Sequence, residues 1–136
     1  MAATENDFLT AVDSFGVPSL ARAQRELLAR LRAKRRLDVR FDRQGADQFQ
    51  YRVHARGVPA PHLLMVYENG KVFVDAQAFE PFGMTETAAI YRALVGFDGP
   101  YATLSTDATL DERVLLALDA VAAGVLARRD EELRAA

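Results

Sequence analysis

The sequence predicts a single α+β domain, residues 1–136, in which helices pack on a contiguous antiparallel sheet. Three observations lead to this prediction. Apolar residues recur at intervals of three and four near both ends of the chain, the period of an amphipathic helix. Between residues 37 and 77 the period is two, as in strands. No helical segment separates these strands, so we expect a four-stranded antiparallel meander with two N-terminal and two C-terminal helices packed on it.

Two helices are expected before the sheet. The first should begin at Thr4, whose hydroxyl can cap it, with Asp7 three residues later as the acidic member of a capping box. Pro18 should end this helix, because proline cannot continue the hydrogen-bond ladder. Ser19 is then the expected N-cap of the second helix, which carries leucines at helical spacing and ends in a basic segment.

Two half-buried strands are expected next, because apolar and polar residues alternate over residues 37–42 and 49–54. If their apolar faces coincide, one register places Asp38 opposite Arg52 as a cross-strand ion pair. The segment 57–61 contains two prolines, which cannot donate to a strand ladder. We therefore expect that segment to be a connection.

The hairpin at Asn69-Gly70 is the clearest local signal, because Asn-Gly is a preferred pair for a two-residue type I′ turn. Such a turn places Val66 opposite Phe73. One face of the hairpin is then wholly apolar. The other face mixes Leu64, Val66 and Phe73 with Glu68, Lys71 and Asp75. This second face is more apolar than a face in water needs to be.

The segment after the hairpin, residues 79–84, is expected to be a loop with unusual apolar content. Thr85 is the expected N-cap of a third helix, which Gly96 should end. Residues 101–104 leave room for a short fifth strand.

The last helix should begin at a capping box formed by Thr109 and Glu112 and extend through Leu133. Residues 114–127 are apolar nearly all round the helix. A helix of this kind is either central to the core or partly covered by another chain.

Composition limits the classes of function. The chain has no cysteine, which excludes a disulfide scaffold, a thiolate nucleophile and Cys-ligated metal sites. It contains no glycine-rich phosphate loop of the GxGxxG or GxxxxGK[ST] type. The net charge of −2 argues against nucleic-acid binding through bulk positive charge. An acidic N-terminal sequence and the lack of a long apolar run favour a cytoplasmic protein outside the membrane.

An enzyme is not expected, and neither is a cofactor or metal. His54 and His62 are the two histidines, and their spacing matches no compact metal-ligand motif. The favoured interpretation is that both lie on the surface at strand ends. The competing interpretation is a small enzyme in which His54, Asp38 and Arg52 form a catalytic or metal site on the outer face of the sheet.

A basic segment at the end of the second helix suggests an alternative function, nucleic-acid binding. Its candidate residues are Arg30, Arg32, Lys34, Arg35 and Arg36. Clustered arginines can neutralise phosphates. The ordinary interpretation is that cations at a helix C-terminus offset the helix dipole, with Asp38 and Asp42 close behind as partners.

The favoured hypothesis is a non-enzymatic protein-binding module, such as an adaptor, a client-specific chaperone, or an antitoxin- or immunity-type binder. Surplus apolar surface on the hairpin, on the 79–84 loop and on the last helix motivates it. The residues expected at the contact are Leu64, Val66, Phe73, Phe79, Phe82 and Met84. The first partner expected is a second copy, bound through the last helix or an edge strand. The alternative is that a third layer of the same chain buries these residues.

Overall fold

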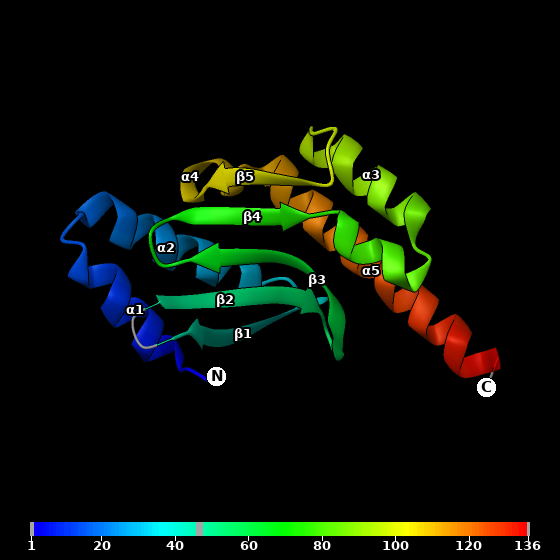
Figure 1. The fold of residues 1–136 in the computed structure, drawn as a ribbon, viewed down its shortest axis with the longest axis horizontal. Helices are drawn as coiled ribbons and strands as arrows, with labels where there is room; N and C mark the ends of the chain where they lie inside the picture. The colour runs from blue at the N-terminus through cyan, green and yellow to red at the C-terminus, as the bar shows by residue number, and fades with distance from the viewer. Residues whose placement is uncertain (1, 46–47, 136) are drawn as a thin grey trace.

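The computed structural model describes residues 2–45 and 48–135. In these residues five strands form one antiparallel sheet, in the order β1-β2-β3-β4-β5, with helices beside it (Figure 1). The predicted α+β fold with a meander sheet is confirmed, and the short fifth strand is present as β5. No helix in the described ranges is both long and apolar enough to cross a membrane.

The strands are β1 (Leu37–Gln44), β2 (Gln48–Ala55), β3 (Val58–Tyr67), β4 (Lys71–Asp75) and β5 (Tyr101–Ser105). The helices are α1 (Glu5–Ser14), α2 (Pro18–Arg32), α3 (Thr85–Val95), α4 (Thr106–Thr109) and α5 (Glu112–Ala135), with a 3-10 helix η1 (Gln77–Phe82). The segment predicted as an apolar loop is therefore mostly η1.

Helices α1, α2 and α5 cover one face of the sheet. Phe8 of α1 is fully buried, with its ring centroid 5.8 Å from that of Phe41 and 5.1 Å from that of Tyr51. Helix α5 contacts β2 and β3 from the same side. In Figure 1 the sheet lies in front of α2 and α5, and no helix crosses the near face of β1 to β4. The core therefore lies on one side of the sheet, and we call the other side the open face.

The predicted register of the hairpin is wrong by one residue. Val66 lies opposite Val72, and Met65 lies opposite Phe73. The loop therefore has three residues and ends at Gly70, whose φ is 92°. A three-residue loop that ends in a left-handed glycine is the next most common way to close a hairpin.

Contacts outside the hairpin hold this longer loop. The Gln24 side-chain amide donates to the Tyr67 carbonyl at 2.9 Å. The Thr106 hydroxyl and backbone amide both donate to the Gly70 carbonyl, at 2.8 and 2.9 Å. As side chains alternate along a strand, the one-residue change places Leu64 and Val66 in the core and Phe73 on the open face.

Two other strand predictions need correction. Asp38 lies opposite His54, while Arg52 lies opposite Arg40. The proline segment 57–61 is not a free connection, because β3 begins at Val58. The pairing of β2 with β3 shifts register near His54, and this irregularity accommodates the prolines.

The predicted helix ends are partly confirmed. The Thr4 and Asp7 capping box is present in both directions, at 3.0 and 3.1 Å. Helix α2 begins at Pro18, one residue before the expected cap, since proline suits the first position of a helix. Met84 occupies the N-cap position before Thr85. Thr109 closes α4, and its hydroxyl donates to the Ser105 carbonyl instead of capping α5.

Two buried tyrosines are expected to respond in opposite ways to loss of the hydroxyl. The Tyr91 hydroxyl donates to the Leu63 carbonyl at 2.8 Å, so Tyr91→Phe should lower the free energy of unfolding by about 1 kcal/mol. The Tyr51 hydroxyl is buried without a hydrogen-bond partner in the described residues, and burial raises the pKa of this phenol. Tyr51→Phe should raise the free energy of unfolding by about 1 kcal/mol. Urea denaturation measures both changes. If both variants shifted the free energy of unfolding in the same direction, the two hydroxyls would not differ in hydrogen bonding as described.

Candidate functional site

Most of the predicted contact residues lie in the core. The side chains of Leu64, Val66 and Phe79 are fully buried, and that of Met84 is 6% exposed. Phe73 is half-buried on the open face, and Phe82 is 41% exposed at the end of η1. The surplus apolar surface expected on the hairpin was largely a consequence of the wrong register. The exposed large apolar side chains therefore lie mainly on other elements.

Helix α3 is apolar on two opposite sides. Its inner side buries Ala88 and Tyr91 against the core. Its outer side exposes Ile90 and Leu94, with exposed fractions of 49% and 47%. Two exposed alanines complete this outer side, and we call the four residues the α3 stripe: Ala89, Ile90, Ala93 and Leu94. Their spacing of one, three and four residues places them on one side of a helix.

The α3 stripe borders a hollow of about 400 Å³ between the end of α3, β5 and the start of α5. We call it the α3–β5 hollow. Its lining includes Leu94 of the stripe, with Val95, Leu104, Ala108 and Val114. Asp111 and Arg113 also line it, and their side chains form an ion pair at 3.1 Å. The surface thus presents a projecting apolar stripe beside an apolar recess.

The sequence contained a signal for the α3 stripe. A single buried side does not account for all the apolar residues of this helix. Placed on a helix of 3.6 residues per turn, Ala89, Ile90 and Leu94 fall away from Ala88 and Tyr91. The core packs against only one of these two apolar sides, and the other is exposed.

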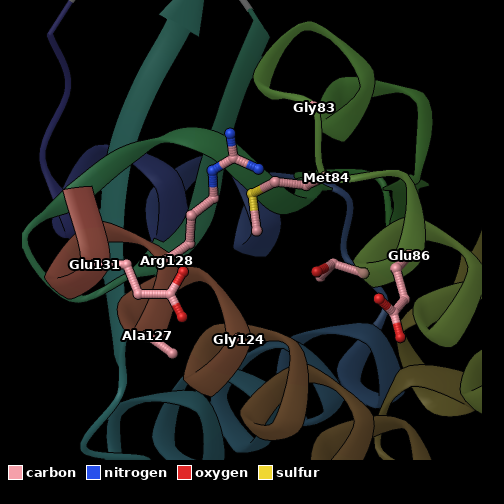
Figure 2. A pocket seen from close by; sticks show the side chains of 8 residues that line it. Gly83, Met84, Glu86, Gly124, Ala127, Arg128 and Glu131 are labelled. Atoms are coloured by element: carbon pink, nitrogen blue, oxygen red, sulfur yellow. The ribbon is translucent and has the colours of Figure 1, made fainter. Parts of the chain in front are cut away.

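A second hollow, of about 320 Å³, lies where the start of α3 meets the second half of α5 (Figure 2). Its lining is Gly83, Met84, Glu86, Thr87, Gly124, Ala127, Arg128 and Glu131. Figure 2 shows the Arg128 side chain reaching toward Met84 and Gly83. The Arg128 guanidinium also bonds the Glu132 carboxylate at 3.1 Å. This hollow is thus mainly polar, and its arginine is already paired.

The basic segment at the end of α2 finds acidic partners in distant parts of the chain. Among the described residues, four of its five cations form ion pairs with acids of α1 and α5: Arg32 with Glu5, Arg36 with Asp119, and Arg30 and Lys34 with Glu112. Arg32 also lies over the Phe41 ring, 5.7 Å from its centroid. These cations join α2 to neighbouring helices, which leaves less charge free for phosphate.

The histidines lie together on the open face, since His54 of β2 is the cross-strand partner of His62 of β3. His54 is buried, whereas a surface position was expected. Its Nδ1 lies 2.9 Å from the Ala55 carbonyl oxygen. His62 Nε2 lies 3.9 Å from Asp75 Oδ2. Burial lowers the pKa of His62, Asp75 opposes that shift, and Arg52 adds to it.

The competing catalytic grouping is only partly assembled. Asp38 does lie opposite His54, but one of its oxygens accepts a hydrogen bond from the Gly57 amide at 3.0 Å. Arg52 lies one row away, opposite Arg40. Within residues 2–45 and 48–135, no group of three or more His, Asp or Glu side chains has an arrangement suited to a metal ion.

No protein family matches the chain, and no significant similarity was found to a curated protein or to a solved structure.

Proposed function

We propose that the protein is a non-enzymatic protein-binding module whose first partner is a second copy of itself. The exposed α3 stripe supports this proposal most directly. Ile90 and Leu94 are large apolar side chains, each about half exposed, on a helix whose other side is already packed. Contiguous apolar surface of this kind commonly marks a protein contact.

A second copy fits this surface because the projecting α3 stripe and the α3–β5 hollow lie next to each other. A symmetric dimer brings one surface patch against the same patch of its partner, so the patch must be complementary to itself. In such a dimer the Ile90 side chain of each copy enters the α3–β5 hollow of the other. The rim residues Asp111 and Arg113 carry both signs of charge, so the two-fold axis can set opposite charges across the contact.

The proposal predicts that the double variant Ile90→Asp, Leu94→Asp is monomeric at concentrations where the wild type is a dimer. Four carboxylates would be placed in an apolar contact. Each 1.4 kcal/mol weakens association about tenfold, so we expect a weakening of at least ~100-fold. Sedimentation velocity over a wide range of concentrations measures this change, with circular dichroism to confirm the fold.

The matched control is Phe15→Asp, because Phe15 is 47% exposed at the junction of α1 and α2, at the opposite end of the molecule from α3 (Figure 1). This variant should associate as the wild type does. A wild type that remains monomeric at every concentration would refute self-association. Equal dimerisation of all three proteins would show that the contact lies elsewhere.

A further inference from the structure

The open face of the sheet carries a row of side chains that the α3 stripe does not involve. Direct cross-strand pairing aligns Arg40, Arg52, Met65 and Phe73 across β1 to β4. Tyr101 of β5 stands beside this row, with its ring centroid 5.1 Å from that of Phe73, and is 56% exposed. We call these five residues the open-face row. In Figure 1 no helix crosses this face of β1 to β4. Arg40, Arg52 and Tyr101 are exposed, Phe73 is half-buried, and Met65 is 9% exposed.

The positive end of the row sets two like charges side by side, and Asp42 on the same face offsets them only in part, since hydrogen bonds and then, to a smaller extent, the Arg52 charge lower the pKa of Asp42. Arg40 and Arg52 are direct cross-strand partners, and like charges in that position destabilise a sheet. Both side chains are exposed. Neither forms an ion pair with another residue in the part of the chain that the structure describes. Two adjacent guanidinium groups that form no ion pair with a carboxylate of their own chain are suited to bind a carboxylate of another molecule.

The other end of the row is apolar and adaptable. Phe73 and Tyr101 form a tilted pair of rings, and Met65 lies between these rings and Arg52. Methionine fills irregular gaps and adapts to different contacts. Arginine, methionine, phenylalanine and tyrosine are the residue types enriched at protein interfaces, and tyrosine and arginine are enriched among the residues that contribute most to binding.

The charges around the row favour a protein segment over nucleic acid. The same face carries three aspartates, since Asp38, Asp42 and Asp75 alternate with the core-facing residues of their strands. A polyanion gains affinity by neutralising several phosphates and would pass close to these aspartates. A single carboxylate between the two arginines meets less of this negative charge than a chain of phosphates does.

We propose that the open-face row binds an acidic segment of another protein, with one carboxylate between Arg40 and Arg52 and an apolar side chain against Met65, Phe73 and Tyr101. Arg52 and Phe73 lie two strands apart, which is about 10 Å at 4.7–4.9 Å per strand. An extended chain advances about 3.3 Å per residue. The segment therefore carries Asp or Glu two to four residues from an aromatic or aliphatic residue. This site is separate from the α3 stripe and does not depend on self-association.

Selection of a random peptide library on the immobilised protein tests the proposal. Enriched peptides should carry the acidic and apolar residues at the stated spacing. Their affinity, measured by isothermal titration calorimetry, should fall about tenfold or more with Arg40→Gln or Arg52→Gln. Replacing the peptide acid by its amide should cause a similar loss. When the arginine substitution and the amide peptide are combined, the loss of binding free energy should be smaller than the sum of the two separate losses, as expected for groups in direct contact.

Three variants show whether the peptides bind at the open-face row. Arg22→Gln changes an exposed arginine of α2 and should leave peptide affinity unchanged. Tyr101→Ala should weaken binding through the apolar end alone. Ile90→Asp, Leu94→Asp should retain full peptide affinity even if it abolishes dimers, so this test and the dimer test fail independently.

A stability measurement distinguishes loss of contact from loss of fold. Because like charges face each other, Arg40→Gln should keep or raise the melting temperature while it weakens binding. The proposal is overturned if selection yields no enriched peptide, if enriched peptides lack an acid, or if the arginine variants bind them as the wild type does. Tighter binding of a labelled single-stranded oligonucleotide through the same arginines would also overturn it.

Discussion

Replacing Phe8 by alanine is expected to lower the free energy of unfolding by about 3–5 kcal/mol, the usual cost of removing a buried phenylalanine ring. Phe8 is fully buried, and its ring contacts Phe41 of β1 and Tyr51 of β2. The variant would leave a cavity between α1 and the sheet. It would also remove edge and tilted ring contacts, which add to the effect of burial alone.

Urea denaturation followed by circular dichroism measures this loss. Phe15→Ala is the matched control, because Phe15 follows the last residue of α1 and its side chain is 47% exposed. Its truncation should change the free energy of unfolding by no more than about 0.5 kcal/mol. A cost below about 1 kcal/mol for Phe8→Ala would mean that α1 does not pack on the sheet as described.

Replacing Gly70 by alanine is expected to cost about 2–3 kcal/mol, from a left-handed backbone penalty of roughly 1–2 kcal/mol and from crowding against α2. The φ of Gly70 is 92°, a region that L residues with side chains rarely adopt. A Cβ at this position would lie 2.8 Å from Leu20 Cδ1. Because Leu20 can rotate away, the backbone penalty should be the larger part.

Two controls separate these contributions in thermal or urea denaturation. Gly16 has a φ of 67°, and a Cβ there would have no neighbour within 4 Å, so Gly16→Ala reports the backbone penalty alone. Gly70→Ala combined with Leu20→Ala should cost less than the sum of the single changes. If Gly70→Ala cost no more than a few tenths of a kcal/mol, the three-residue loop would be wrong and a different turn would close the hairpin.

The contact residues show how one residue of register changes a functional interpretation. From the sequence, Leu64, Val66 and Phe73 share one face of the hairpin. In the structure the first two are core residues and only Phe73 faces outward. An Asn-Gly pair fits both a two-residue turn and a loop one residue longer. The choice is made by hydrogen bonds to the loop from Gln24 and Thr106, which lie far from it in the sequence.

The basic segment illustrates the same limit for charge. In the sequence, the only acids close behind the cations around Arg32 and Arg36 are Asp38 and Asp42, so a phosphate partner stands as the alternative to helix-dipole compensation. The acids that pair with them are Glu5, Glu112 and Asp119, up to 83 residues away in the chain. Conversely, one register that the apolar pattern permits pairs Arg52 with Asp38, whereas the observed register places Arg52 opposite a second arginine, Arg40.

The fold class, the order of the strands and of the four longer helices, and the Thr4 capping box follow from the amino-acid sequence alone, because backbone periodicity and local capping depend on residues only a few positions apart. The hairpin register, the partners of the basic segment, and the identity of the exposed apolar side chains follow only from the tertiary structure, because they depend on how distant segments pack and pair. Both proposed contacts, the α3 stripe and the open-face row, belong to this second group, since each consists of what the packed core and the paired strands leave exposed.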